Sequence, residues 1–329
     1  MKTLETLYIV MPCYNEEAGI STTIATVSAK LTALIEQQKI APDSAMLFAD
    51  DGSRDSTWSI IAEHHAHNPM VKASRLAGNR GKEKALFAGL MEARGLADIV
   101  ICMDADLQHD INAIEEFLEL RQEGFELIYG VKKSRGKESF LRKAPSVLFY
   151  WLAAKCGSPV CQGHADYSLM TRQVLEALSE YGESNMMFRT MLKQLGFKQC
   201  PLYFNVLERT LGESKMSLRS LLRLSIDAIT SYSVTPLRFI SGMGMLIFLI
   251  SLGMITWVIY DYFKLGTPNG WATLTCSLWF LGGLGMVSLG IVGEYIGKMY
   301  METKKRPRYF IKTRLHSHVS QRFSKGIVK

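Results

Sequence analysis

Three carboxylates lie within seven residues in the segment MDADLQHD (103–110), directly after the apolar run ADIVIC (97–102). The apolar run is typical of a buried strand. Asp104 and Asp106 are two positions apart, so their charges repel unless a positive group lies between them. Hard divalent cations take oxygen ligands and often hold substrate phosphates. The pair therefore indicates a metal-assisted phosphate site. The alternative is a solvated turn, and Asp110 fits best as the residue that opens the next helix.

Two further polar clusters follow predicted strands in the same way: PCYNEE (12–17) and DDGSRDST (50–57). Short apolar runs alternate with helical patterns along the first 130 residues or so, which predicts an α/β fold with a mostly parallel sheet covered on both faces. Ligands bind such open sheets beyond the carboxyl ends of the strands. The three clusters are therefore expected to meet in one site. The expected strands are 7–12, 45–50, 71–76, 98–104 and 125–131, and the expected helices are 17–38, 55–67, 82–93 and 111–122.

Two common nucleotide-binding motifs are absent from the sequence. No GxGxxG follows the first strand and no GxxxxGK[ST] occurs, which argues against a dinucleotide dehydrogenase and a P-loop NTPase. Residues 132–235 are expected to be largely helical and basic. Two stretches stand out in this part, GHADYSLMTR (163–172) and a basic, Leu-rich stretch at 208–239.

Two apolar segments, 239–260 and 271–292, carry no charged residue. Each is close to the roughly 20 residues that a helix needs to cross a bilayer. Basic residues flank the pair, and the short connection between the segments holds one Lys. The positive-inside rule then predicts two transmembrane helices with both termini in the cytoplasm. Residues 216–236 fit an amphipathic helix on the membrane interface, with an ordinary packed helix as the alternative.

The formal net charge of +7 is partly a consequence of this membrane-flanking pattern. The basic residues gather beside the predicted spans, and the tail from residue 304 on is basic enough to lie on an anionic leaflet. A basic chain can also bind nucleic acid, but the position of the charge argues against that partner.

At this point the chain resembles a known family, the bacterial polyprenyl-phosphate glycosyltransferases of glycosyltransferase family 2. The motifs that carry the resemblance occur in family order: IVMPCYNEE, FADDGSRDST, GNRGKEKALFAGL, MDADLQH, ERTLGESKMSL and GEYIGKMYMETKKRPRYF. Each motif alone is weak evidence, but the ordered set covers nearly the whole chain.

The resemblance implies a GT-A-type, Rossmann-like nucleotide-sugar domain with a C-terminal region of two transmembrane helices. Asp104 and Asp106 match the pair that holds Mg²⁺ or Mn²⁺, and Asp166 matches an acidic position near the reacting sugar. The set expected to act in catalysis is Asp104, Asp106, Asp166, Arg209 and Lys215. The set expected to bind the donor is Pro12, Tyr14, Asn15, Glu16, Asp51, Lys82, Asp104, Arg209, Ser214 and Lys215.

Elementary chemistry supports these roles. A nucleoside diphosphate leaving group gains negative charge as the glycosidic bond breaks, so a cation with Arg and Lys stabilises it. A lipid phosphate has a second pKa of about 6 and is largely ionised at pH 7, so a strong general base is less necessary than for a hydroxyl acceptor. Asp166 is therefore open to three roles: orienting the acceptor, binding sugar or accepting a proton. The family often has Asp-Phe-Arg where this chain has Asp166-Tyr167-Ser168, and Arg189 retains a basic residue nearby.

The expected organisation is a cytoplasmic GT-A domain (1–215), an amphipathic helix (216–236), two transmembrane helices with a short external loop (237–297) and a basic cytoplasmic tail (298–329). The expected activity is inverting transfer of a hexose from a nucleotide sugar, first of all a UDP-hexose such as UDP-glucose, to polyprenyl phosphate at the bacterial cytoplasmic membrane. The expected partners are the nucleotide sugar, the lipid, the membrane and a further copy of the chain. A catalytically silent sensor and a processive polysaccharide synthase are the alternatives, although the synthase's QxxRW motif is absent.

Overall fold

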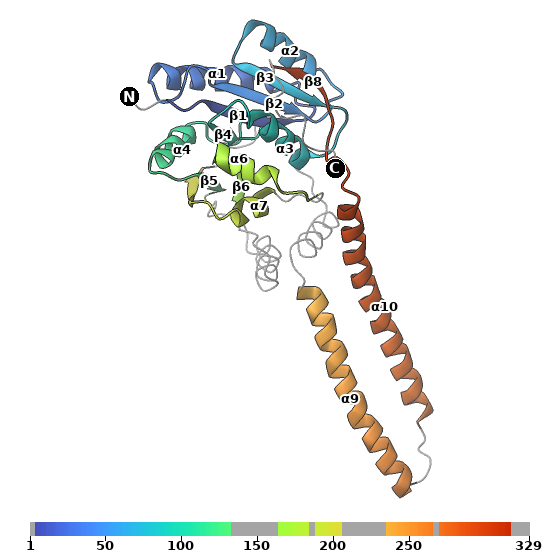
Figure 1. Ribbon diagram of the computed structural model, residues 1–329. Coiled ribbons are helices and arrows are strands. Elements are labelled where there is room, and N and C mark those ends of the chain that lie inside the picture. The colour runs from blue at the N-terminus through green and yellow to red at the C-terminus, as the bar shows by residue number, and fades with distance from the viewer. Residues whose placement is uncertain (1–3, 133–163, 184–187, 206–234, 266–269, 317–329) are drawn as a thin grey trace, which may run out of the picture. The chain divides into compact units, whose positions relative to one another are not determined.

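The computed structural model describes residues 4–132, 164–183, 188–205, 235–265 and 270–316 (Figure 1). The chain divides into two compact units. The described residues up to Asn205, together with those from Arg306 on, form the first unit, which is called the catalytic unit below because most of the residues expected to act in catalysis or donor binding lie in it. The second unit holds the two long apolar helices. The predicted interface helix (216–236) lies almost wholly outside the described residues.

The catalytic unit alternates strands and helices, as the sequence predicts. Its first nine elements are β1 (Leu7–Cys13), α1 (Ile20–Glu36), β2 (Ala45–Asp50), α2 (Thr57–His67), β3 (Val71–Leu76), α3 (Lys82–Ala93), β4 (Ile99–Cys102), α4 (Ala113–Gln122) and β5 (Leu127–Lys132). The remaining described elements are β6 (His164–Thr171), α6 (Arg172–Ser179), α7 (Phe188–Gln194), β7 (Gln199–Phe204) and β8 (Ile311–Leu315). All five strands expected in the first 131 residues are present.

An eight-stranded sheet runs in the order β7-β5-β6-β4-β1-β2-β3-β8. β4, β1, β2 and β3 are mutually parallel, and β1 lies between β2 and β4. The chain therefore continues from β1 to β2 and β3 on one side of β1, and later to β4 on the other side of β1. The place between β1 and β4 is the topological switch point, where open sheets bind ligands. The sheet is mixed rather than fully parallel. β6 runs antiparallel to β4 and β5, and β8 runs antiparallel to β3, whereas β5 and β7 are parallel to each other.

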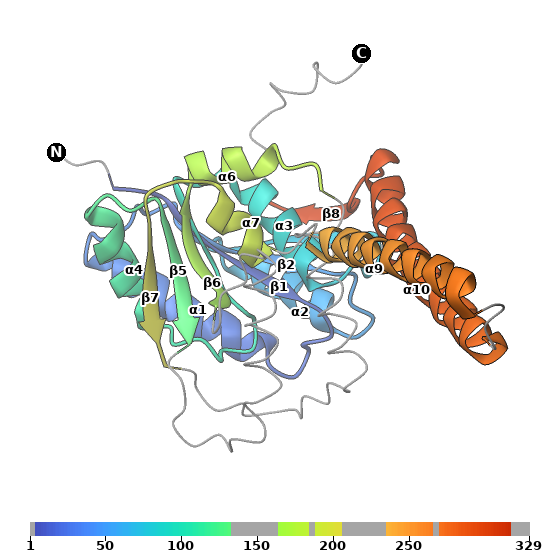
Figure 2. The same cartoon turned by 90° about the horizontal axis from the view of Figure 1, so that it is seen from below.

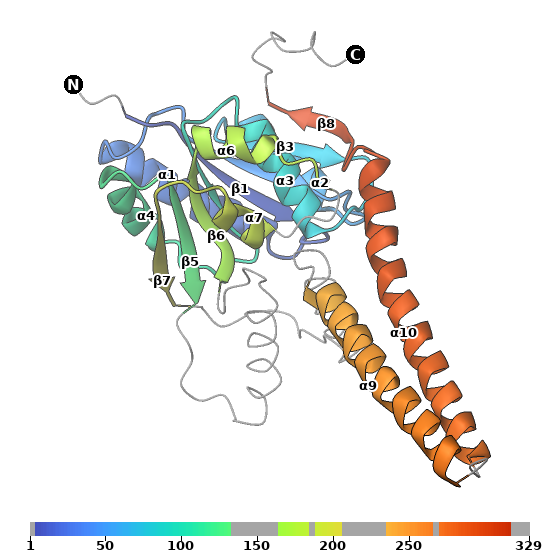
Figure 3. The same cartoon turned by 60° about the horizontal axis from the view of Figure 1, so that its bottom comes forward.

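Helices cover both faces of the sheet, as Figures 2 and 3 show. Alternate residues of β1 point to opposite faces: Leu7, Ile9 and Met11 belong to one buried cluster, and Tyr8 and Val10 belong to the other. The first cluster takes its helical residues from α1, α2 and α4, and the second from α3, α6 and α7. Because both faces are buried, the strands read as continuous apolar runs.

The expectation that residues 132–235 are largely helical is wrong for β6 and β7. β6 alternates Ala165, Tyr167 and Leu169 with Asp166 and Ser168, which is a strand-like period of two, although Asp is depleted in strands. The Asp166 and Ser168 side chains are buried in a central strand that pairs with β4 on one side and β5 on the other. Tertiary pairing therefore overrides local preference here.

The second unit contains α9 (Thr235–Leu265) and α10 (Trp271–Thr303), which run alongside each other. Both are long and apolar enough to cross a membrane over Leu237–Met254 and Phe280–Thr303. Large apolar side chains are well exposed on both helices, among them Phe263 and Leu278. Such continuous exposed apolar surface is unusual for a soluble protein and fits contact with lipid.

The C-terminal segment from residue 298 on, expected as a basic tail, contains the end of a helix and a strand. α10 continues to Thr303, and Ile311–Leu315 forms β8, which pairs with β3 at the edge of the sheet. Phe310 O accepts a hydrogen bond from Ala77 N at 2.8 Å, and the Tyr309 ring packs against Phe87 of α3. The segment after α10 is therefore part of the catalytic unit's fold.

Candidate active site

The carboxyl ends of β1, β2 and β4 meet at one edge of the sheet. The register pairs Cys13 with Asp50 and Val10 with Cys102, so the segments after these strands emerge side by side. β6 runs antiparallel to β4 with Cys102 opposite Ser168, which brings the start of β6, and Asp166, to the same edge. The sequence prediction that the polar clusters meet is confirmed by this register.

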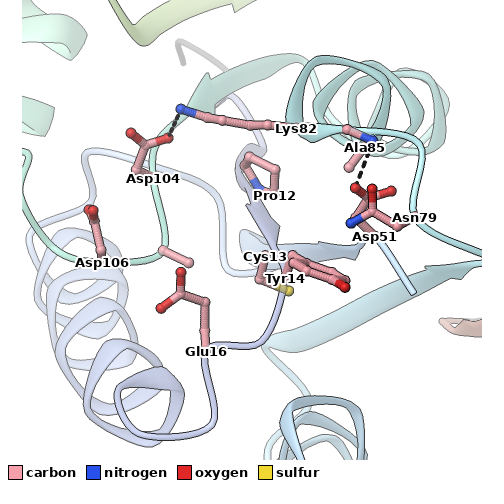
Figure 4. Close-up of a pocket in the computed structure, with 12 residues that line it drawn as sticks. Pro12, Cys13, Tyr14, Glu16, Asp51, Asn79, Lys82, Ala85, Asp104 and Asp106 are labelled. Atoms are coloured by element: carbon pink, nitrogen blue, oxygen red, sulfur yellow. Dashed lines mark hydrogen bonds and ion pairs between the residues drawn. The ribbon is translucent and has the colours of Figure 1, made fainter. Parts of the chain in front are cut away.

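A cavity of about 310 Å³ lies at this edge (Figure 4). Six of the predicted donor-binding residues line it, together with several neighbours that the prediction missed. The lining is Pro12, Cys13, Tyr14, Glu16, Asp51, Asn79, Gly81, Lys82, Ala85, Asp104, Ala105 and Asp106. Asn79, Gly81 and Ala85 all belong to the GNRGKEKALFAGL motif, so that motif was the available signal for them.

Asp51 fixes the glycine-rich loop that leads into α3. Its two carboxylate oxygens accept hydrogen bonds from the backbone N–H groups of Arg80 and Gly81 at 2.7 and 2.8 Å. Burial raises the pKa of Asp51, and these two bonds oppose the rise. The loop also approaches Gly52 closely, since a Cβ at Gly52 would lie 2.9 Å from Gly78 Cα and its φ is +72°. Both observations make this loop a rigid wall of the cavity.

Asn15 does not line the cavity but ties two of the loops together. Its N–H donates to Ser53 Oγ at 3.0 Å, and its Oδ1 accepts from the Arg54 N–H at 2.9 Å. Its φ of 54° is unusual for a residue other than glycine, although Asn adopts it more readily than most. A direct contact of Asn15 with the donor stays a prediction.

A partly buried ion pair supports the loop after β2. Asp50 is fully buried, and Arg75 Nε lies 3.1 Å from its Oδ2. Arg75 Nη2 also donates to Ser53 O at 2.7 Å, and its guanidinium lies 5.5 Å from the centre of the Trp58 ring. Arg75 thus holds both the carboxylate and the turn that follows it.

Asp104 and Asp106 project into the cavity from the segment after β4 (Figure 4). His109 lies beneath them, almost fully buried, and its Nδ1 accepts a hydrogen bond from the Asp104 N–H at 3.2 Å. The ring is stacked on Tyr167 with centroids 4.8 Å apart. Burial lowers the pKa of His109, although Asp104 opposes the change. The neutral ring therefore serves to position the loop that carries the two carboxylates.

Lys82 joins Asp104 to Asp166. Its Nζ lies 2.6 Å from Asp104 Oδ1 and 2.8 Å from Asp166 Oδ2. Burial would lower the pKa of Lys82, but the two carboxylates outweigh burial and hold it well above its usual value. Arg189 of α7 binds the other side of Asp166, with Nε 2.6 Å from Oδ1 and Nη2 3.0 Å from Oδ2. The structure thus brings Asp166 into the same charge network as Asp104.

Glu83 is a carboxylate of this network that the sequence prediction missed. Burial, followed by the charge of Asp166, raises the pKa of Glu83 to about 7, while Arg189 and Lys82 oppose the rise. Its Oε2 is buried and has no hydrogen-bond partner among the residues that the structure describes. The Gly-Lys-Glu sequence at the start of α3 was the only signal for Glu83. The predicted residues Arg209, Ser214 and Lys215 lie outside the described residues, and their roles stay predictions.

The sequence of this chain matches a known protein family and several relatives. Residues 8–195 match the family described as Glycosyl transferase family 2. An uncharacterized glycosyltransferase of Bacillus subtilis, YkoT, is 40% identical over 94% of this chain and 92% of its own length. The bactoprenol glucosyl transferase of Shigella phage SfX is 34% identical over 93% of this chain and 98% of its own length.

A solved structure of glucosyl-3-phosphoglycerate synthase from Mycobacterium tuberculosis covers 69% of this chain and 76% of its own, with 21% identity and a TM-score of 0.45. Because that superposition is weak, the assignment rests on the sequence matches. The family match covers more than half of the chain, and the relatives match almost all of it. The chain belongs to glycosyl transferase family 2, and the protein is a glycosyltransferase.

Proposed function

We infer that this glycosyltransferase moves a hexose from a UDP-hexose, with UDP-glucose as the first candidate, to polyprenyl phosphate at the cytoplasmic face of the bacterial membrane. The observation that carries the inference is the cavity that gathers Tyr14, Asp51, Lys82, Asp104 and Asp106 at the switch point of the sheet. The full-length similarity to bactoprenol glucosyl transferases supports both glucose and the lipid carrier.

The two ends of the cavity suit the two ends of a nucleotide sugar. Tyr14 and Asp51 offer an aromatic face and a carboxylate, which suit a base and its polar edge. Lys82, Asp104 and Asp106 offer charged groups, which suit a diphosphate and the cation that accompanies it. On this basis the base would bind beside β1 and β2, and the diphosphate would bind beside β4.

The carboxylates fit a divalent cation of the Mg²⁺ or Mn²⁺ type. Within the described residues no group of three His, Cys, Asp or Glu side chains converges on one point. Asp104 and Asp106 are hard oxygen donors, and cations such as Mg²⁺ are commonly bound by one or two carboxylates together with substrate phosphates and water. The cation would neutralise charge on the leaving diphosphate. Lys82 already bonds to Asp104, so it adds a fixed positive charge at the same place.

The transfer requires few protein groups. An oxygen of the acceptor phosphate forms a bond to the anomeric carbon, and the bond from that carbon to the diphosphate oxygen breaks with its electron pair on the diphosphate. Inversion follows from attack opposite the leaving group. Because the acceptor phosphate is already ionised at pH 7, no proton has to be removed. The work of the site is to position the reactants and stabilise the developing charge.

The proposed membrane placement is supported by chain connectivity. The described strands that flank the helices, β7 before α9 and β8 after α10, both belong to the catalytic unit, since β7 pairs with β5 and β8 pairs with β3. If α9 and α10 both cross a membrane, the two strands must lie on the same side of it. The basic residues at these ends and the positive-inside rule favour the cytoplasm. A homo-oligomer stays a prediction.

The test is release of nucleoside diphosphate by the purified full-length protein. UDP-glucose, UDP-galactose, UDP-GlcNAc and GDP-mannose would each be supplied with and without polyprenyl phosphate, and with EDTA. We expect release from UDP-glucose that needs both the lipid and a divalent cation, and little release by Asp104→Asn. Donor binding without lipid-dependent release from any of the four would contradict the proposal and favour a membrane-bound sensor.

A further inference from the structure

Arg189 and Lys82 are two cations from different elements that share one carboxylate. Asp166 is almost fully buried, and both of its oxygens are bonded to these two residues. Lys82 Nζ and Arg189 Nη2 both bind the same atom, Asp166 Oδ2, at 2.8 and 3.0 Å. The two nitrogens are therefore close enough for one small anion to contact both.

The two cations remain accessible although the carboxylate between them is not. The Lys82 and Arg189 side chains are 47% and 48% exposed, whereas that of Asp166 is 4% exposed. The bonds to Asp166 occupy Nε and one N–H of Nη2, and the other guanidinium N–H groups make no hydrogen bond to another described residue. An arrangement that served only to neutralise Asp166 would not require two cations with outward-facing donors.

The position of the pair relative to the donor cavity points to its ligand. Lys82 lines the cavity and bonds to Asp104, while its other bond leads to Asp166 and Arg189 outside the cavity lining. A phosphate on Lys82 and Arg189 would therefore lie next to the place proposed for the donor diphosphate. An acceptor phosphate must occupy such a place to reach the anomeric carbon.

The local charges also argue against a proton-accepting role for Asp166. Burial would raise the pKa of Asp166, but Arg189 and Lys82 outweigh burial and hold it well below its usual range. A carboxylate that is paired so strongly is a poor proton acceptor near pH 7. Glu83 also interacts electrostatically with Arg189 and Lys82.

We propose that Arg189 and Lys82 bind the phosphate of the acceptor, and that Asp166 is a positioning residue that fixes the spacing of the two cations. This inference rests on the proposed function, because it names the residues that receive the lipid phosphate. The recognised group is a phosphate monoester, and the guanidinium of Arg189 provides the paired N–H donors that suit it.

The first experiment measures binding of farnesyl phosphate, a short isoprenyl phosphate, to the full-length protein in detergent by calorimetry. We expect Arg189→Ala to weaken binding by about 10–100-fold and Arg189→Lys to weaken it less, since a charged bidentate contact is lost. UDP affinity in the presence of Mn²⁺ should change by less than about 3-fold. Farnesol and inorganic phosphate, tested separately, show whether the isoprenyl chain or the phosphate group is recognised. We expect inorganic phosphate to compete with farnesyl phosphate for binding.

Arg172→Ala is the matched control. Arg172 is 46% exposed and pairs with Asp98 at 3.0 Å, but it lies at the opposite edge of the sheet, next to the start of β4. We expect the affinity of the Arg172→Ala variant for farnesyl phosphate to match that of the wild type. Equal binding by the Arg189 variants and the wild type, or equal losses of UDP and farnesyl phosphate affinity, would overturn the inference. A wild type that neither binds farnesyl phosphate nor releases UDP with it would instead overturn the proposed function.

Asp166→Asn separates positioning from proton transfer. As a positioning residue, Asp166 affects how well the cations hold the acceptor, so the variant should have a higher KM for farnesyl phosphate, about 10-fold or more, with a smaller change in kcat. The pH profile of kcat should keep its shape. A large fall in kcat with unchanged KM, or the loss of one limb of the pH profile, would show that Asp166 accepts a proton and would overturn this part of the inference.

Discussion

Glu92, near the end of α3, connects the C-terminal segment to the helix that carries Lys82. Its Oε2 and Oε1 accept hydrogen bonds from Arg314 Nε and Nη2 at 2.6 and 3.0 Å, and His316 Nε2 lies 3.2 Å from Oε2. Burial would raise the pKa of Glu92, but His316 and Arg314 outweigh burial and lower it from the ordinary 4.5 to about 2. We expect Glu92→Gln to destabilise the folded protein at neutral pH.

The size of the effect follows from the pKa. A fall from 4.5 to about 2 corresponds to at most about 3 kcal/mol of extra stability for the folded protein. The Arg314 side chain is 36% exposed, so water and salt screen part of the attraction. We therefore expect a loss of about 1–2 kcal/mol, which lowers the Tm by about 2–4 °C per kcal/mol in a unit of this size.

The effect has a defined pH dependence. Because the pKa of Glu92 is lower in the folded protein, its stabilisation is complete above about pH 4.5 and is lost as the pH falls toward about 2. The wild type should therefore lose more stability in this window than Glu92→Gln, and the difference between the two should shrink as the pH falls. Thermal unfolding of the full-length protein in detergent, followed by tryptophan fluorescence between about pH 7 and about pH 3, measures the difference.

The exposed Glu176 provides the control, because Glu176→Gln should leave the Tm unchanged. A double-mutant cycle with Arg314→Gln should give a coupling energy of about 1 kcal/mol between the two side chains. A stability difference between wild type and Glu92→Gln that stays constant from about pH 7 to about pH 3 would refute the assignment of this stability to the ion pair.

Three further outcomes test other parts of the structure. Asp104→Asn should lower the rate of diphosphate release by about 10²-fold or more, with the fold retained by circular dichroism, because it removes one charge from the proposed cation site. Gly52→Ala should weaken UDP binding and lower the stability by about 1–3 kcal/mol, whereas Gly95→Ala, with open space around its Cβ, should do neither; equal effects would contradict the loop geometry. Arg75→Ala should cost about 1–3 kcal/mol in denaturant unfolding, since the buried Asp50 would keep its hydrogen bonds from Ser53 but lose its cation, and no measurable cost would show that the pair does not form in solution.

Local pattern was sufficient to predict most of the catalytic unit. The strands before residue 132 are apolar runs bounded by turn residues, and α3 begins and ends at the residues that its pattern indicates. β6 was missed although Ala165, Tyr167 and Leu169 alternate with Asp166 and Ser168, because the alternation is short and the burial of the two polar side chains depends on pairing with β4 and β5. β8 was missed because its sequence, IKTRL, is largely polar and gains its strand conformation from the free edge of β3.

The site shows the same division between local and long-range information. Asp104 and Asp106 were identified because their spacing after a strand carries the chemical signal within a few residues. The link from Lys82 through Asp166 to Arg189 joins three segments that are far apart in sequence, and no spacing rule predicts which cation meets which carboxylate. The position of Asn15 is similar, because its role in tying two loops together depends on the loop after β2.

The place of β8 in the chain constrains the order in which the protein is made. β8 is encoded after both apolar helices, yet it completes the edge of the sheet beside β3. During synthesis, the ribosome must therefore produce α9 and α10 before the last strand exists, and until then β3 remains an open edge, which is a site for wrong pairing. Tyr309 and Arg314 also reach α3 only at that stage. The contacts of the C-terminal segment with α3, the helix that carries Lys82, thus form only after the two apolar helices have been synthesised. A chain that ended within these helices would lack β8 and would leave the β3 edge of the sheet unpaired.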